Sequence, residues 1–457
     1  MLAMRLVQEQ IGFNRRNVLL VALVALISAG CISCGAMGST SSDGGIPPFS
    51  LYWSVAVADL NGDGLPDIVT SFTFFASATE QTGSVAVYLQ NAVKSGAFLS
   101  PTKYPVGNHP VAIAIGDLNG DGKPDIVTAN TILNSNDTSS AVNVLMQDAS
   151  NPGHFSPATN YTTGTAPVAV AIGDLNGDGK PDLVVSDDSG ISLLLQDPST
   201  PGGFLPRMTI AVGGATSSLA VADLNGDRLP DLVVTTGTSV VVLLQNSNQP
   251  ATFSAPSTYT AGLQPIWVAV SDLDGDGKPD LAVANLGSGS DGTTASLSVL
   301  LGDPTAPGKF LAASDYKTGS NSSFVAVADL NGDGKPDIAV ANNGGLAGVC
   351  PPTCSLSGSL SVLLQDPASA GHFMSATNYA AQDQVLGVAT VDVNGDGKTD
   401  LVIDNGGGVV IRLQDPTQPG SFLDAVAIGN EQAPLILRLP LPQCNWDRRR
   451  SSAKHAA

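Results

Sequence analysis

The chain has little positive charge, little histidine and no long apolar segment. Its 20 Lys and Arg stand against 40 Asp and Glu, giving a formal net charge of −20, and there are only 4 His in 457 residues. This excess of acid favours solubility and argues against nucleic acid as a partner. The longest apolar run, residues 18–30, has 13 residues, fewer than the ~20 that a membrane-spanning helix needs.

One nine-residue acidic phrase is abundant. Asp59-Leu-Asn-Gly-Asp-Gly-Leu-Pro-Asp67 recurs six more times along the chain. Each copy places side-chain oxygens at positions 1, 3, 5 and 9, and carboxylates at this spacing repel one another unless a hard cation lies among them. The sequence therefore predicts up to seven calcium ions as cofactors. The predicted metal ligands are Asp59, Asn61, Asp63, Asp67, Asp117, Asn119, Asp121, Asp125, Asp174, Asn176, Asp178, Asp182, Asp223, Asn225, Asp227, Asp231, Asp272, Asp274, Asp276, Asp280, Asp329, Asn331, Asp333, Asp337, Asp392, Asn394, Asp396 and Asp400.

The phrase differs from an EF-hand loop at the decisive position. Position 12, where an EF-hand carries a bidentate Glu, is Thr, Val or Ile in every copy. An alternating apolar segment precedes each phrase and a short apolar run follows it, as in residues 55–59 and 67–70. These patterns are typical of strands, so the loop is expected to join two strands, with position 9 supplying the last carboxylate.

Two copies depart from the glycine and proline pattern. Position 6 is Gly in six copies, which permits the positive φ that turns the oxygens inward, whereas the fourth copy has Arg228. A left-handed Arg costs roughly 1–2 kcal/mol, so the fourth site is expected to be the weakest. The seventh copy has Thr399 in place of Pro at position 8.

A second repeated element is a turn of the form Leu-Gln-Asp-Pro-x-x-Pro-Gly-x-Phe, as at residues 195–204. Its Phe lies 19 residues before the next acidic phrase in all six cases, while the distance from each phrase to its following Phe varies from 30 to 44 residues. Each repeat then holds four short strands. Seven such units predict an all-β fold, a seven-bladed β-propeller of four-stranded antiparallel blades with calcium-binding hairpin loops.

The repeated phrase Val-Ala-Val-Ala-Asp-Leu-Asn-Gly-Asp-Gly-Lys-Pro-Asp resembles the FG-GAP/VCBS repeat, the unit of the integrin α-subunit propeller and of many exported bacterial proteins. The resemblance covers residues 51–430. It implies a seven-bladed propeller with calcium in the loop that joins the first two strands of each blade. It implies function only loosely, because one fold hosts many activities.

Strand order predicts the two faces of the ring. Acidic loops and Gln-Asp-Pro turns should lie on one face, and the variable loops on the other, together with the connections between blades. The inserted length falls at about residues 71–83, 129–140, 285–296 and 341–358. A macromolecular ligand is expected on this variable face.

The termini differ in composition from the repeats. Residues 1–30 read as an export signal, 31–50 as a linker rich in Gly, Ser and Pro, and 431–457 as a solvated, disordered tail. Ser28-Ala-Gly-Cys31 resembles a bacterial lipobox, so lipidation at Cys31, with a membrane anchor, and plain secretion both remain open. Cys350 and Cys354 are expected to form a disulfide within the longest variable loop, because disulfides persist outside the cell.

Three functions remain open. The first is a non-catalytic adhesion or binding module at the bacterial cell surface, with a carbohydrate or extracellular protein as ligand. The second is a propeller enzyme, a lyase or hydrolase acting on polysaccharides, and the third is a structural scaffold. Catalysis needs non-repeated groups that converge, and the His residues form no such set: His154 and His372 occupy one repeat position. The chain is therefore not expected to be an enzyme. Trp53 and Trp267 are candidates for stacking on a sugar, although a buried aromatic is the commoner role.

Overall fold

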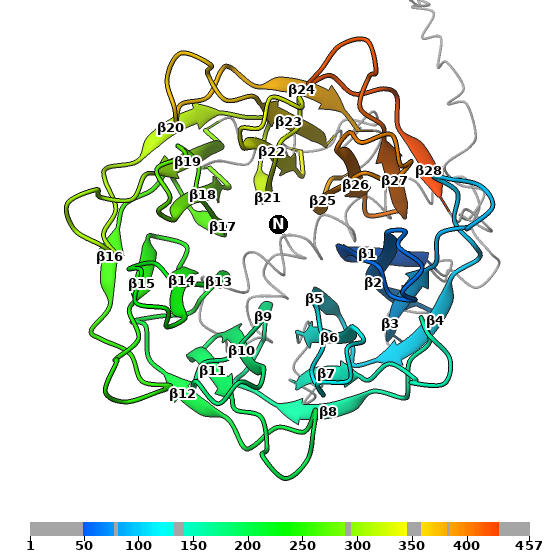
Figure 1. Ribbon diagram of the computed structural model, residues 1–457, viewed down its shortest axis with the longest axis vertical. Coiled ribbons are helices and arrows are strands. Elements are labelled where there is room, and N and C mark those ends of the chain that lie inside the picture. The colour runs from blue at the N-terminus through cyan, green and yellow to red at the C-terminus, as the bar shows by residue number, and fades with distance from the viewer. Residues whose placement is uncertain are drawn as a thin grey trace, which may run out of the picture.

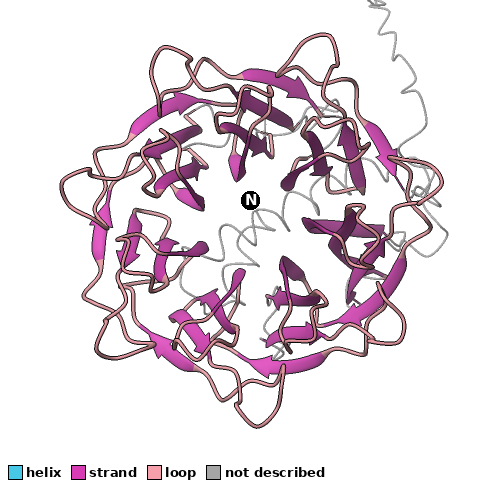
Figure 2. Ribbon diagram, in the orientation of Figure 1, coloured by secondary structure: helices cyan, strands magenta, loops and turns pink. Residues whose placement is uncertain are grey.

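The computed structural model describes residues 49–76, 81–131, 141–287, 294–344, 358–381 and 384–428. Within these residues, 28 strands form seven antiparallel sheets of four strands each. The sheets stand as blades around a central axis (Figures 1 and 2). The predicted seven-bladed propeller is confirmed. In the part of the chain that the structure describes, no helix has the length and apolar character needed to span a membrane.

Each blade takes four consecutive strands. The first three blades are β1 (Phe49–Ala58), β2 (Asp67–Phe75), β3 (Gln81–Tyr88) and β4 (Thr102–Val106); β5 (Pro110–Gly116), β6 (Asp125–Asn130), β7 (Ala141–Leu145) and β8 (Thr159–Thr162); and β9 (Ala169–Gly173), β10 (Asp182–Asp187), β11 (Gly190–Leu194) and β12 (Met208–Ile210). Blades 4 and 5 are β13 (Ser218–Ala222), β14 (Asp231–Thr235), β15 (Val240–Leu243) and β16 (Ser257–Tyr259); and β17 (Pro265–Ser271), β18 (Asp280–Asn285), β19 (Ser296–Leu300) and β20 (Ser314–Lys317). Blades 6 and 7 are β21 (Ser322–Ala328), β22 (Asp337–Asn342), β23 (Ser359–Leu363) and β24 (Thr377–Ala380); and β25 (Gly387–Val391), β26 (Asp400–Asp404), β27 (Val409–Arg412) and β28 (Val426–Ile428).

The first strand of each blade lies nearest the axis and the fourth lies on the outer rim (Figure 1). Second strands such as β6 and β18 are buried along their whole length, because each blade packs against a neighbour on both faces. Their apolar side chains therefore alternate between two interblade cores. Val69 of blade 1, for example, lies in one cluster with Ile126, Leu145 and Phe155 of blade 2.

The repeated Phe of the turn contacts the blade before it. Phe155 packs edge-on against Tyr104 with ring centroids 5.5 Å apart, and its backbone N–H donates to the Tyr104 hydroxyl oxygen at 3.3 Å. Four further Tyr–Phe pairs have the same T-shaped geometry. Where the rim strand lacks Tyr, Ile210 and Ile428 take its place in clusters with Phe253 and Phe98. The fixed 19-residue interval in the sequence thus reflects a fixed joint between blades.

The ring closes without a shared strand among the described residues, because strand order is sequential in all seven sheets. Blades 7 and 1 meet through one apolar cluster that contains Val55, Phe72, Val393 and Val402. The Gln90 side chain of blade 1 also donates to the Val393 carbonyl at 2.6 Å. The seam between the first and last blades is therefore held by side-chain contacts of the same kind as the other joints.

One predicted loop is partly wrong. Residues 71–75 and 81–83, expected in a variable loop, belong to β2 and β3, and Phe75 pairs with Gln81. The alternation Ser-Phe-Thr-Phe-Phe extends the hairpin, because such residues suit a pleated, half-buried surface. The remaining variable segments 132–140, 288–293 and 345–357, with Cys350 and Cys354, lie outside the described residues. So do Cys31, residues 1–48 and residues 429–457.

Candidate functional site

In all seven acidic loops, the carboxylate at position 1 accepts hydrogen bonds from backbone N–H groups of the same loop. In the first, Asp59 Oδ1 accepts the Gly62 N–H at 2.7 Å and Oδ2 accepts the Gly64 N–H at 2.9 Å. Asn61 Oδ1 accepts the Asp63 N–H at 2.9 Å, and its amide donates to Asp63 Oδ2 at 3.1 Å. The position-1 carboxylate therefore organises the turn, while Asn61 and Asp63, at positions 3 and 5, lie nearer the surface and are bonded to each other.

The position-9 carboxylate lies under the loop and is fully buried. Asp67 Oδ2 accepts the Leu60 N–H at 2.9 Å, and Oδ1 accepts the Gln90 N–H at 2.7 Å. It thus fixes the loop to the end of the third strand. Burial, reinforced by the carboxylates at positions 1 and 5 and opposed by the two N–H bonds, raises the pKa of this group. The value is about 6 for Asp125, Asp182, Asp231, Asp280 and Asp337.

The fifth loop gathers the most negative charge. Asp272, Asp274 and Asp276 each offer a carboxylate oxygen within 4.8 Å of the others. Position 3 is Asp here, so no amide donor separates it from position 5, and Lys278 contacts Asp276 at 2.7 Å. A set made only of carboxylate and amide oxygens fits a hard cation such as Ca²⁺ and suits softer metals poorly. Positions 1, 3 and 5 would supply its exposed ligands and position 9 its buried one.

The fourth loop keeps the common geometry despite its Arg. Arg228 has a φ of 69°, and its N–H donates to Asp223 Oδ2 at 2.8 Å, as the position-6 glycine does elsewhere. The left-handed conformation predicted from the sequence is therefore retained, together with the strain that a Cβ brings to it.

Six of the seven loops also accept a hydrogen bond from a glutamine of the blade that follows. Gln147 of blade 2 donates its side-chain N–H to the Leu60 carbonyl in loop 1 at 2.9 Å, and Gly153 leaves room for the Asn61 Cβ, which a Cβ on Gly153 would approach to 3.3 Å. The same interblade glutamine bond occurs at five other joints. Its other donors are Gln90, Gln196, Gln245, Gln365 and Gln414. In blade 5, Gly302 stands at this position, so loop 4 receives no such bond.

The acidic loops and the Gln-Asp-Pro turns therefore share one face, as predicted. On the opposite face, the bases of the variable hairpins in blades 2, 5 and 6 bond to the neighbouring connection, as Gly287 N–H does to the Leu263 carbonyl at 2.9 Å. The interblade glutamines were not predicted as joints. Their signal was the Leu-Gln-Asp-Pro turn, whose Gln recurs in six blades.

A second polar network joins the outer three strands of several blades. Asn285 donates to Ser298 Oγ at 2.8 Å, and the Ser298 hydroxyl donates to Asp315. Asn342 and Ser361 make the equivalent bond at 2.8 Å in blade 6. This network was not predicted from the sequence, because Asn and Ser at strand ends are common in ordinary turns.

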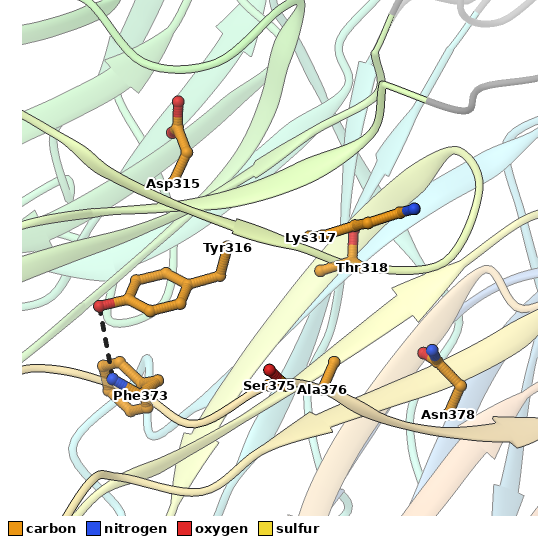
Figure 3. Close-up of a pocket in the computed structure, with 8 residues that line it drawn as sticks. All are labelled: Asp315, Tyr316, Lys317, Thr318, Phe373, Ser375, Ala376 and Asn378. Carbon is orange, nitrogen blue, oxygen red and sulfur yellow. Dashed lines mark hydrogen bonds between the residues drawn. The ribbon is translucent and has the colours of Figure 1, made fainter.

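The rim holds a groove of about 520 Å³ between β20 and β24, lined by Tyr316, Phe373 and six other residues (Figure 3). Three of its polar side chains already have partners: Asp315 and Asn378 accept hydroxyl bonds from Ser298 and Ser361, and Tyr316 accepts the Phe373 N–H at 3.4 Å. The groove is thus a product of the interblade joint and not a distinct site.

The tryptophan and histidine candidates do not converge. Trp53 is 8% exposed and donates its indole N–H to Thr73 at 2.9 Å, beside the buried His109. The half-buried Trp267 stacks on Phe324 with centroids 4.0 Å apart. His154 and His372 contact carbonyls of their own turns. Trp53 is therefore a core residue, and only Trp267 retains a partly open ring.

Acidic hairpin loops repeated in every blade of a seven-bladed ring define a class of repeat propellers. Comparison with known families shows which family the chain belongs to. The model of the FG-GAP-like repeat matches residues 74–128, 131–185, 174–234 and 223–283, and that of the FG-GAP repeat matches 51–88 and 321–350. The chain belongs to the FG-GAP repeat family. It is 37% identical to human integrin alpha-7 over 78 residues, a match that spans 16% of this chain and 7% of the integrin.

Solved structures share the fold at low sequence identity. A candidate 6-phosphogluconolactonase from Bacteroides uniformis is 11% identical with a TM-score of 0.51, over 75% of this chain and 92% of that one. A lectin from Agrocybe aegerita that recognises non-reducing terminal N-acetylglucosamine is 18% identical with a TM-score of 0.49, over 82% and 94%. Rhamnogalacturonan lyase YesW is 14% identical with a TM-score of 0.46, over 84% and 75%. At these identities the similarity concerns the fold alone.

Proposed function

We propose that the protein is an exported, calcium-stabilised propeller that binds a carbohydrate or an extracellular protein at the cell surface and catalyses no reaction. The metal assignment rests on the fifth loop, where one carboxylate oxygen from each of three Asp side chains lies within 4.8 Å of the others. In a site without a cation their mutual repulsion would oppose the folded loop. The other six loops have Asn in place of Asp at position 3 but share the backbone hydrogen bonds of the fifth, as Asp59 and Asp272 show, so one cation per loop is the consistent assignment.

The distribution of sequence variation supports a binding role. Loops on the acidic face are nearly identical in all seven blades, whereas the opposite face carries all the inserted length. Variable loops on a rigid scaffold are where recognition usually resides. In contrast, the described His residues lie either in a buried core or in separate turns, which supports binding over general acid–base catalysis.

The test is a binding screen of the exported chain against glycans and matrix proteins, with calcium and with a chelator. Shortening the 341–358 loop should abolish or redirect binding while leaving calcium content and melting temperature nearly unchanged. Ser199→Ala, in a turn on the acidic face, is the matched control and should leave binding intact. A ligand whose affinity survives the loop deletion and falls with Ser199→Ala would reverse the face assignment.

A further inference from the structure

The turn between β26 and β27 brings an asparagine, a glycine and a buried carboxyl together. Asp404, Asn405, Gly406 and Gly407 follow one another at the end of β26. The Gly406 N–H donates to Asp404 Oδ1 at 2.8 Å, and the Gly407 N–H donates to Asn405 Oδ1 at 3.2 Å. The backbone nitrogen of Gly406, which can attack the side chain of Asn405, therefore has a proton acceptor in Asp404 Oδ1. The side-chain oxygen of Asn405 has a hydrogen-bond donor in the Gly407 N–H.

Asp404 is 0% exposed, and its Oδ2 has no hydrogen-bond partner within the part of the chain that the structure describes. Burial raises the pKa of Asp404 to about 8, and the smaller opposing effect is the hydrogen bond from the Gly406 N–H. The ionised form of such a group is a stronger base than an exposed carboxylate. Gly406 also has the conformational freedom that attack on the preceding side chain needs, with a φ of 73°.

We propose that Asn405 is a self-modification site, at which Asp404 acts as the base for deamidation through a succinimide. Asp404 takes the amide proton of Gly406, and the Gly406 nitrogen bonds to Cγ of Asn405. The oxyanion formed at Oδ1 is held by the Gly407 N–H. The Cγ–Nδ2 bond then breaks, and the proton on Asp404 leaves with the departing ammonia. Water opens the ring at either carbonyl, leaving Asp or isoaspartate at position 405.

The chain contains internal comparators for this reaction. Asn343-Gly344 has the same dipeptide, but the Gly344 N–H donates to the Ser320 carbonyl at 3.1 Å, which is a poor base, and Asn343 Oδ1 has no donor among the described residues. It should therefore react at the background rate.

The acidic loops contain six more Asn-Gly pairs with a different environment. In loop 6, Asp329 Oδ1 accepts the N–H groups of both Gly332 and Asp333, so its lone pairs are shared. The Asn331 amide nitrogen is itself bonded to Asp333 at 3.2 Å. These contacts weaken the base and hold the leaving group, so the loop asparagines should react slowly while the loops are intact.

The product alters the seam that closes the ring. Asp404 projects from the same face of β26 as Val402, which packs against blade 1. Isoaspartate adds a methylene to the main chain of the turn that joins Asp404 to its cross-strand partner Val409. Accumulation of the product at position 405 would therefore loosen the blade 7 side of this seam.

To test the proposal, the intact protein is incubated with calcium at mildly alkaline pH, and the deamidation rate of every Asn-Gly peptide is measured by mass spectrometry. Asn405 should deamidate faster than Asn343 and the loop asparagines. In Asp404→Asn, the rate at Asn405 should fall about 100-fold, the scale of general base catalysis, with Asn343 unaffected.

Two results would overturn the proposal. One is equal rates at Asn405 and Asn343 in the unaltered protein, which needs no variant and is independent of whether Asp404→Asn folds. The other is an unchanged rate at Asn405 in a folded Asp404→Asn protein. The variant Asn405→Asp provides the chromatographic standard for the normal Asp product and separates it from isoaspartate.

Discussion

At the scale of single residues, Asp404 is the main departure from the repeat. The equivalent positions in the other blades hold Ala, Ser or Thr, such as Ser186 and Thr235. These small side chains also lie buried without a hydrogen-bond partner. A carboxyl at this position destabilises the fold more than a hydroxyl does, because a buried charge must be paired or neutralised. Its cross-strand partners Gly387 and Val409 are uncharged, so neutralisation by a proton is the available solution.

Asp404 therefore makes stability depend on pH. The pKa of Asp404 is about 8 in the folded protein against a usual 3.8, so the folded state holds more protons than the unfolded state between these values. The contribution of Asp404 to stability is fully present below pH about 4 and is lost as pH rises through about 8, with a slope of about 1.4 kcal/mol per pH unit between these values. Asp404→Asn should remove this slope. Chemical denaturation across the pH range tests it, and parallel curves for the two proteins would contradict it.

Arg228 is the second residue where the repeat is strained. Its φ of 69° is one that glycine adopts freely, so Arg228→Gly should stabilise the protein by about 1 kcal/mol. Urea unfolding with saturating calcium measures the change. The same substitution at an exposed helical or extended position would destabilise, so a loss of stability would show that the loop does not require a positive φ.

The strain at Arg228 should also affect the metal. Asp276→Ala should remove one bound calcium, whereas Asp227→Ala, in the Arg228 loop, should change the stoichiometry less, because that site is already weaker. Loop 4 also lacks an interblade glutamine, since Gly302 stands in its place. Native mass spectrometry counts the ions, and an equal loss from both variants would count against a weak fourth site.

At the scale of elements, the interblade glutamine is the joint with the clearest energetic consequence. Gln196 donates to the Leu118 carbonyl at 2.6 Å and the Pro181 carbonyl at 3.2 Å, and is 4% exposed. Gln196→Leu leaves a buried carbonyl without its donor, which costs about 1–3 kcal/mol. Gln418→Leu, in an exposed turn, is the matched control and should change stability by less than about 0.5 kcal/mol. Equal effects in thermal unfolding would mean that the joint contributes nothing.

The elements show how far the sequence could predict this molecule. The acidic loop recurs seven times and the turn Phe lies 19 residues before the next loop, so strand order, blade number and the two faces could be predicted from the spacing. The partners of Phe155 and Gln147 could not, because Tyr104 and Leu60 belong to another blade and no local pattern encodes a contact between blades. The length of β2 was misjudged at residues 71–75, where β-favouring residues continue past the usual strand end.

At the scale of the whole molecule, the acidic loops make one face of the ring strongly negative. They hold 22 of the 40 Asp and Glu of the chain. Each loop also contacts the following blade, as Gln147 does with Leu60, so a metal bound in one loop would stabilise the joint to the next. In repeat proteins, stability is approximately a sum of such nearest-neighbour terms. Removal of the metal should therefore weaken the ring as a whole.

Chelation should consequently lower the melting temperature and broaden the transition. A cation that binds only the folded state adds about 2.7 kcal/mol per site at a concentration 100 times its Kd, and loss of this term exposes the repulsion among Asp272, Asp274 and Asp276. Calorimetry with calcium, with a chelator and after calcium is restored measures the effect. Magnesium is the control, because it requires a tighter octahedral site and gives up water reluctantly, so it should restore less stability. If the chelated and calcium-loaded proteins melt at one temperature, the loops do not hold structural calcium.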